Sequence, residues 1–242
     1  MSVVEFRDVS YEIGGRPILA GVSFAVEAGE TLVLLGRSGS GKTTALKMTN
    51  GMLRPTRGQV LIDGRASVEW DPIRLKRHIG YVIQEVGLFP HFTVADNVGL
   101  VPKLENWEHP RIVKRVDELL NAVGLPAAQF RLRYPRQLSG GQRQRVGVAR
   151  ALAADPALLL FDEPFGAVDP VTRAELQQQF LALRHDFQKT SIFVTHDVRE
   201  ALRLGTRIAL LANGRVELIA EPQIFRQARI EEARAFLKGL ED

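Results

Sequence analysis

The chain has 242 residues, which is enough for one large α/β domain or two small ones, with a substantial buried core. Its 32 Lys and Arg against 28 Asp and Glu give a net charge of +4, and because these charges are scattered and mixed in sign, they favour solvated faces over a nucleic-acid-binding patch. The lack of cysteine excludes disulfides and thiolate metal sites, and the apolar runs are far shorter than the roughly 18 to 20 residues that span a bilayer.

The first third of the chain predicts strands around a glycine-rich loop. Short runs of alternating or continuous apolar residues are typical of strands, and Gly14-Gly15 and Asp63-Gly64 mark turns between them. After the glycine-rich loop, residues 43–50 have the composition of a helix, and Gly51 is a typical C-terminal stop. Strands are expected at residues 3–9, 22–26, 31–35 and 60–62.

The rest of the chain alternates between helical and strand-like patterns. Residues 93–125 show helical spacing, a further helix is expected from about Gly140 to Ala153, and another covers residues 170–187. The tail at 223–240 is typical of one or two amphipathic helices. Short all-apolar strands that alternate with helices indicate a largely parallel sheet in a single α/β domain. These strands are expected at 158–161, 191–194 and 208–211.

The glycine-rich loop, Gly36 to Thr43, fits the pattern G-x-x-x-x-G-K-[ST] with a strand before it and a helix after it. Its glycines let backbone N–H groups converge on a phosphate at the positive end of a helix. Lys42 is expected to reach the β- and γ-phosphates of ATP, and the hydroxyl of Thr43 to bind Mg²⁺. The nucleotide-binding residues predicted here are Gly36, Arg37, Ser38, Gly39, Ser40, Gly41, Lys42, Thr43 and Thr44.

Two acids follow the apolar run at 158–161. Carboxylates at the end of a buried strand are costly unless they meet cations or polar partners. With a phosphate loop in the same chain, Asp162 fits a Mg²⁺ site and Glu163 fits the general base that activates water. The alternative for this pair is a strand-end cap or a structural salt bridge.

The stretch Leu138-Ser139-Gly140-Gly141-Gln142, followed by a helix, resembles the signature loop of the ABC ATPases. A serine and glycine N–H groups at a helix N-terminus form a second phosphate cradle; a plain N-cap at Ser139 is the alternative. The resemblance implies a P-loop NTPase (RecA-like) core with an ABC β-subdomain and an inserted α-helical subdomain. The core is expected at 1–84 and 156–222, the insertion at 85–155 and the helical tail at 223–242.

The resemblance also implies functions for residues whose type and spacing alone would not indicate one. Tyr11 matches the aromatic residue that stacks on adenine, and Gln84 matches the glutamine that contacts Mg²⁺. His196 matches the switch histidine, which holds the γ-phosphate and positions Glu163. Asp169 matches an acid of the inter-subunit loop, in which Gly166 stands where the family more often has serine.

For the whole protein, the resemblance implies an ATPase at the cytoplasmic face of the membrane, a peripheral subunit that powers import. Two copies are expected to enclose two ATP molecules head to tail, bound to separate permease subunits and served indirectly by a solute-binding protein, with no nucleic acid. Residues 79–84 and 87–98 resemble the osmoprotectant importers, whose solutes are quaternary amines such as glycine betaine, carnitine or choline. Many members of that subfamily carry regulatory CBS modules after the ATPase, and we expect none here.

Two other classes share the same ATPase motifs. DNA-maintenance ATPases of the ABC type separate their motifs by long coiled coils, and ribosome-associated members fuse two cassettes, whereas this chain shows neither feature. The segment from Gln84 to Asn97 is expected to dock a permease, because exposed apolar clusters mark interfaces. Its apolar residues are Val86, Leu88, Phe89 and Phe92.

Overall fold

The computed structural model describes residues 2–84, 87–166 and 168–240, so Glu85, Val86 and Ala167 of the motifs above lie outside the described residues. The chain forms two compact units. The first unit comprises residues 1–76 and 189–242, and the second unit comprises residues 77–188, so the second is inserted into the sequence of the first.

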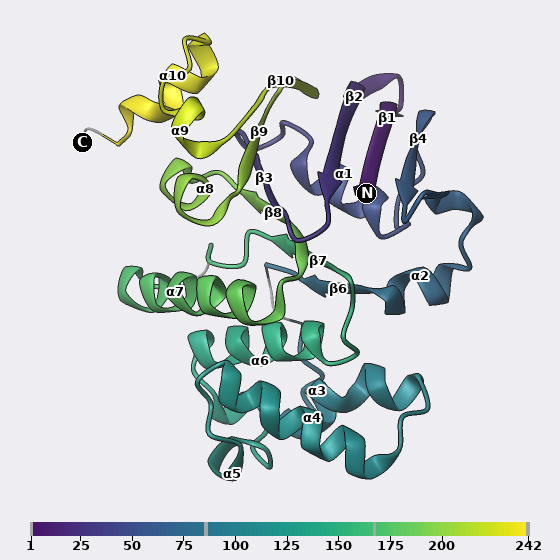
Figure 1. The fold of residues 1–242 in the computed structure, drawn as a ribbon, viewed down its shortest axis with the longest axis vertical. Coiled ribbons are helices and arrows are strands. Elements are labelled where there is room, and N and C mark those ends of the chain that lie inside the picture. The colour runs from purple at the N-terminus through teal and green to yellow at the C-terminus, as the bar shows by residue number, and fades with distance from the viewer. Residues whose placement is uncertain (1, 85–86, 167, 241–242) are drawn as a thin grey trace. The chain divides into compact units, whose positions relative to one another are not determined.

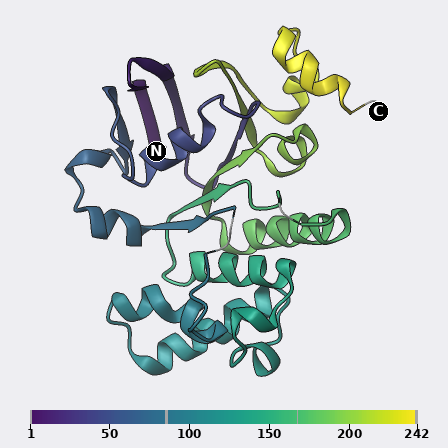
Figure 2. The ribbon, with the colours of Figure 1, turned by 180° about the vertical axis from the view of Figure 1, so that it is seen from behind.

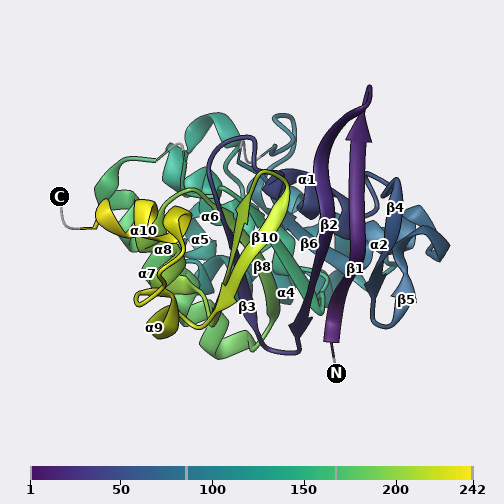
Figure 3. The same cartoon turned by 90° about the horizontal axis from the view of Figure 1, so that it is seen from above.

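The first unit contains an antiparallel sheet with the strand order β2-β1-β4-β5. Gly14 and Gly15, both at positive φ, form the tight turn between its two long strands, which lie side by side in Figure 3. Phe6 and Phe24 stack across these strands with ring centroids 4.3 Å apart, which anchors the apolar face of the sheet. The strands are β1 (Ser2–Ile13), β2 (Arg16–Glu27), β4 (Arg57–Ile62) and β5 (Arg65–Ala66).

The other sheet strands of the first unit follow the order β10-β9-β3-β8. In the middle of this group β3 pairs in parallel with both β9 and β8, and every residue of β3 and β8 is buried, which explains the apolar runs at 32–35 and 192–194. Strand β10 is antiparallel to β9. The bounds are β3 (Thr31–Leu35), β8 (Thr190–Thr195), β9 (Arg207–Ala212) and β10 (Arg215–Ala220).

Helices of the first unit follow the sheet strands in sequence (Figure 2). Helix α1 follows β3 directly, and α8 follows β8. The tail contains α9 and α10, as expected for residues 223–240. The bounds are α1 (Lys42–Thr49), η1 (Ser67–Glu69), α2 (Pro72–His78, whose last two residues belong to the second unit), α8 (Val198–Leu204), α9 (Pro222–Phe225) and α10 (Glu231–Lys238).

The second unit combines two parallel strands with a group of helices (Figure 1). Strand β6 packs closely on α6, because a Cβ at Gly80 would lie 2.4 Å from the carbonyl oxygen of Ala151. Helix α6 packs against α3 and α4 and also against α7. The bounds are β6 (Ile79–Val82), α3 (Val94–Leu104), α4 (His109–Ala122), α5 (Ala127–Phe130), η2 (Pro135–Gln137), α6 (Gly140–Leu152), β7 (Leu158–Asp162) and α7 (Pro170–Phe187).

The helical spacing at 93–125 belongs to two helices, not to a continuous one. Helix α3 starts at a capping box in which Thr93 and Asp96 exchange hydrogen bonds, and it ends before Asn106, which has a positive φ of 56°. Pro110 then lies in the first turn of α4. Within the described parts of the chain, none of the helices has the length and apolar character needed to cross a membrane.

Candidate functional site

The phosphate loop joins β3 to α1 in the first unit, and its glycines are required by close contacts. A Cβ at Gly36 would lie 2.3 Å from the carbonyl oxygen of Leu211, and one at Gly41 would lie 2.5 Å from a methyl carbon of Leu19. Gly41 also has a φ of 101°, which side chains rarely allow. The backbone of the loop therefore takes a conformation that only glycine permits at these two positions.

Two polar groups of the loop are buried within it. Lys42 is 4% exposed, and its ammonium donates hydrogen bonds to the carbonyl oxygens of Gly36 at 2.7 Å and Arg37 at 2.8 Å. The hydroxyl of Ser40 is buried without a hydrogen-bond partner among the described residues. Because a buried polar group favours a hydrogen-bond partner, phosphate oxygens at this loop would satisfy the Ser40 hydroxyl beside the Lys42 ammonium, as the sequence motif predicts.

His196 lies at the same edge of the sheet as the phosphate loop. In the parallel pairing of β3 with β8, Leu35 is opposite Thr195, so the loop and His196 both follow the carboxyl ends of neighbouring strands. His196 is exposed. The backbone after it is held by Asp197, whose carboxylate caps α8 by accepting from the N–H of Arg199 at 2.7 Å.

Tyr11 is connected to the phosphate loop through the neighbouring strand. It lies on β1 opposite Leu19 of β2, and Leu19 is the residue whose side chain packs against Gly41. Tyr11 is half-buried. The first unit thus brings together three of the sequence-predicted elements, namely the phosphate loop, Tyr11 and His196.

The two acids lie at the end of β7 in the second unit. Asp162 is the last residue of the strand, and Glu163 follows with a φ of 45°, in the left-handed region. This conformation is unfavourable for residues other than glycine, so the surrounding structure must stabilise it. It is common at functional sites. Both side chains are half-buried.

Tyr81, for which the sequence predicted no role, is hydrogen-bonded to Asp162 in the structure. Its hydroxyl donates to Oδ2 of Asp162 at a distance of 3.3 Å. Burial, followed by the nearby carboxylate charge, raises the pKa of Tyr81 far above its ordinary value, so the hydroxyl stays protonated. The sequence signal was a lone tyrosine in an otherwise apolar strand.

Gln84 lies near the same end of the second unit. Strands β6 and β7 run in parallel with Val82 opposite Phe161, so Gln84 and Glu163 each follow the carboxyl end of one strand. A Cβ at Gly166 would lie 3.3 Å from the amide nitrogen of Gln84, which shows that the loop after Glu163 approaches Gln84 closely.

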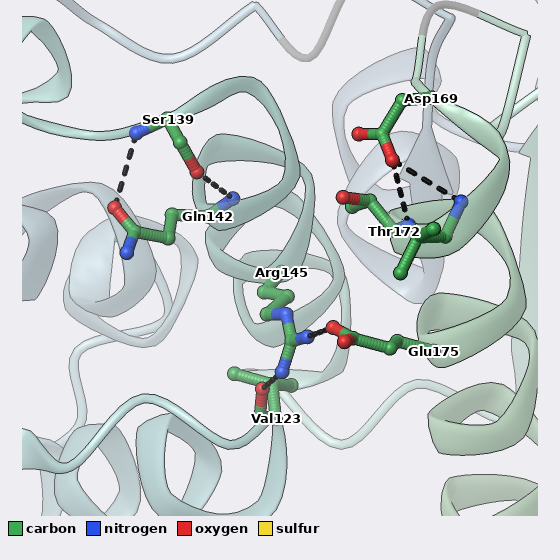
Figure 4. Close-up of polar contacts among 8 residues, drawn as sticks. Val123, Ser139, Gln142, Arg145, Asp169, Thr172 and Glu175 are labelled. Carbon is green, nitrogen blue, oxygen red and sulfur yellow. Dashed lines mark hydrogen bonds and ion pairs between the residues drawn. The ribbon is translucent and has the colours of Figure 1, made fainter.

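Ser139 caps α6, which is the alternative that the sequence left open for this residue. The cap still leaves the O–H of Ser139 available as a hydrogen-bond donor. The Ser139 hydroxyl accepts from the N–H of Gln142 at 3.2 Å, and the side-chain oxygen of Gln142 accepts from the N–H of Ser139 at 3.0 Å (Figure 4). A hydroxyl can accept one hydrogen bond and donate another at the same time. The cap and a phosphate cradle are therefore compatible at this position, where Ser139 and Gly140 are both exposed.

Asp169 caps the neighbouring helix α7. It accepts hydrogen bonds from the N–H groups of Val171 at 3.1 Å and Thr172 at 3.0 Å (Figure 4). Hydrogen bonds from the side chain of Thr172 and, to a smaller extent, from its backbone lower the pKa of Asp169. A Cβ at Gly141 would lie 2.5 Å from the methyl group of Thr172, so the two helix starts are in contact.

Arg145 connects α6 to α7 at a point further from their N-termini. Its guanidinium donates to Glu175 of α7 at 2.9 Å and to the carbonyl oxygen of Val123 at 3.3 Å (Figure 4). The starts of α6 and α7, which carry Ser139 and Asp169, are therefore joined by direct contacts within the second unit.

The residues predicted to bind metal have the donor chemistry that suits Mg²⁺. Thr43, Gln84 and Asp162 offer hydroxyl, amide and carboxylate oxygens, which are hard donors of the kind that Mg²⁺ prefers. In the described residues no group of three or more His, Asp or Glu side chains is arranged to hold a metal ion. Each of these oxygen donors, taken by itself, suits Mg²⁺, which usually keeps several ligands from water or substrate phosphates.

Comparison with known proteins gives consistent matches. A family model described as ABC transporter matches residues 19–166. The osmoprotectant import ATP-binding protein OsmV of Salmonella typhimurium is 49% identical over 210 residues, which cover 86% of this chain and 55% of the relative. The glycine betaine/carnitine/choline transport ATP-binding protein OpuCA of Bacillus subtilis is 45% identical over 225 residues, 93% of this chain and 59% of the relative. The spermidine/putrescine import ATP-binding protein PotA of Nitrosospira multiformis is 47% identical over 222 residues, 92% of this chain and 60% of the relative.

A solved structure extends the match to the fold. A dimeric ATP-binding cassette in a post-hydrolysis state, bound to ADP and Pi, superposes with a TM-score of 0.79 and 34% identity, over 90% of this chain and 98% of that one. The expected α/β fold with a phosphate loop is confirmed by this likeness. The chain spans little more than half the length of the curated relatives described above.

Proposed function

The chain belongs to the ABC transporter family, and from this we propose that it binds and hydrolyses ATP as the energising subunit of an importer. The observation that carries the proposal is the phosphate loop. Its positions 36 and 41 have room only for glycine, and the loop contains the buried ammonium of Lys42 and the buried hydroxyl of Ser40. Such a loop at the start of a helix is a site for phosphate.

The other site residues have complementary roles in this proposal. Thr43, Gln84 and Asp162 hold Mg²⁺, which neutralises charge on the phosphates when it is bound. Glu163 takes a proton from the attacking water, and His196 positions that water and the γ-phosphate. Tyr11 contacts the adenine ring through its aromatic face.

We further propose that two copies of the chain act together. Ser139 and the glycines beside it bind the γ-phosphate held by the phosphate loop of the other copy, and Asp169 lies at the same interface. Three observations support this: Ser139 and Gly140 are exposed, the Ser139 cap leaves its hydroxyl donor available, and the similar solved cassette is dimeric. The proposed dimer is head to tail, with an ATP molecule at each of two shared sites.

The proposed solute is a quaternary amine osmoprotectant, because relatives named for osmoprotectant, glycine betaine, carnitine and choline transport are 45–49% identical to the chain. A relative named for polyamine import, at 47% identity, defines the competing solute class. In either case the solute contacts the permease and a solute-binding protein, and the chain stays peripheral at the cytoplasmic face.

We expect the chain, assembled with its permease in vesicles and supplied with the solute-binding protein, to support ATP-dependent uptake of radiolabelled glycine betaine, choline or carnitine. Excess unlabelled spermidine is expected to leave this uptake unchanged, because a binding site for a quaternary ammonium group recognises it by cation–π contact with aromatic rings. A Lys42→Ala vesicle is the matched control for ATP dependence. Uptake of spermidine with no uptake of quaternary amines would contradict the proposed solute class.

The segment that follows Gln84 is our proposed permease-docking surface. Within it Phe89 is 42% exposed, whereas Leu88 and Phe92 are half-buried. The loop is held by its backbone, since Asn97 accepts from the N–H of Phe89 at 2.8 Å and donates to its carbonyl oxygen at 3.2 Å. The ring of Phe89 also packs beside Phe92, with ring centroids 5.2 Å apart, and its exposed part is available to a partner.

We expect Phe89→Asp to weaken co-purification with the permease and solute uptake by about tenfold or more, because a charge replaces a ring buried at the interface. Basal ATP hydrolysis by the isolated chain is expected to stay within about twofold of wild type. The matched control is Leu104→Asp at the end of α3, where the leucine is 46% exposed. If Phe89→Asp assembles and transports normally, the docking surface lies elsewhere.

A further inference from the structure

The contact between Tyr81 and Asp162 joins two strands that are far apart in the sequence. In the parallel pairing of β6 with β7, Tyr81 lies opposite Leu160. Residues two apart on a strand share a face, so Asp162 lies on the face of Leu160 and one step further along it. The long side chain of Tyr81 spans this step, and its hydroxyl donates to Oδ2 of Asp162 at 3.3 Å.

The position of Tyr81 is set by the backbone beneath it. Gly80 lies against the end of α6, where any side chain would meet the carbonyl oxygen of Ala151 at 2.4 Å and the side chain of Leu159 at 2.6 Å. Strand β6 is thus closely packed against both α6 and β7. The Tyr81 hydroxyl is therefore presented to Asp162 by the fold and not by a mobile loop.

A single hydrogen bond of this length contributes little to stability. O–H···O hydrogen bonds are usually about 2.7 to 2.8 Å long, so the 3.3 Å contact is weak. The contact is therefore suited to orient a carboxylate more than to hold the fold together.

We propose that Tyr81 is a positioning residue that orients the Asp162 carboxylate toward the Mg²⁺ of bound Mg·ATP. This inference rests on the proposed function, in which Asp162 is a metal ligand. Carboxylates that bind metal are themselves held by hydrogen bonds from surrounding side chains, and loss of such a partner costs about 10- to 100-fold in metal affinity or activity. Tyr81 does not contact the substrate; it acts through Asp162.

The test compares Tyr81→Phe with wild type and with Tyr134→Phe, the same substitution at an exposed tyrosine of the second unit. A fluorescent ATP analogue is titrated onto each protein in EDTA and then at increasing Mg²⁺, and Mn²⁺ binding to the nucleotide-loaded protein is followed by electron paramagnetic resonance. We expect Tyr81→Phe to bind nucleotide like wild type in EDTA but to need about tenfold more Mg²⁺ for half-maximal enhancement. Its Mn²⁺ dissociation constant is expected to rise similarly.

The remaining measurements separate positioning from structure and from the proposed function. Tyr134→Phe is expected to match wild type, and Asp162→Asn is expected to lose the Mg²⁺ enhancement altogether. The inference is overturned if the Mg²⁺ requirement of Tyr81→Phe stays within twofold of wild type. It is also overturned if Tyr81→Phe loses nucleotide affinity equally in EDTA and in Mg²⁺ and has a lower melting temperature. If wild type itself shows no Mg²⁺-dependent nucleotide binding, the proposed function fails first and the inference fails with it.

Discussion

Replacement of Glu163 by Gln is expected to lower ATP hydrolysis by about 100-fold or more while ATP still binds. The amide has the size of the carboxylate but cannot take the proton of the attacking water. The left-handed backbone at this position, with a φ of 45°, suits Gln about as well as Glu, so the change should not disturb the turn. Because hydrolysis no longer resets the protein, the variant should accumulate as an ATP-bound dimer.

The measurements are phosphate release under single-turnover conditions, filter binding of labelled ATP and size-exclusion chromatography with and without ATP. Glu118→Gln is the matched control, since this glutamate lies on the exposed face of α4 and forms a long ion pair of 3.9 Å to Lys114. The control should hydrolyse ATP at the wild-type rate. Near-normal turnover of Glu163→Gln would remove this residue from the role of general base.

The second large effect is expected from mixing two inactive variants. Lys42→Ala removes the ammonium of the phosphate loop, and Ser139→Arg fills the exposed cradle at the start of α6 with a long side chain. Each homodimer then has two damaged sites and should be inactive. In a head-to-tail heterodimer both lesions can fall on the same site, which leaves the other site intact, so the mixture is expected to recover measurable ATP hydrolysis.

Both variants should fold well enough for this test. Loss of the Ser139 cap costs about 1 kcal/mol, which is small against the stability of a whole domain. The control is each variant mixed with a differently tagged copy of itself, which should show no recovery. Heterodimers that are confirmed by tandem affinity purification and remain inactive would argue against sites shared between two chains.

The sequence by itself was sufficient wherever the signal is local. The phosphate loop, the capping pair of Ser139 and Gln142 and the start of α7 after Asp169 each depend on residues within a few positions of one another, and their chemistry is visible as a motif. The continuous apolar runs of β3 and β8 likewise predicted buried parallel strands. Strand β10 was missed, although Asn213-Gly214 is a typical hairpin turn, because its half-exposed sequence has no continuous apolar run.

Contacts between distant parts of the chain were decided only by the tertiary structure. His196 comes to the edge of the phosphate loop because the register of β3 and β8 sets Leu35 opposite Thr195, and no motif encodes a register. Tyr81 reaches Asp162 for the same kind of reason, since pairing brings together residues that are 81 positions apart. Sequence patterns report which residues are apolar, flexible or charged at short range, whereas strand pairing is set by packing of the whole sheet. The local motifs were therefore visible in the sequence, whereas the hydrogen bond between Tyr81 and Asp162 was not.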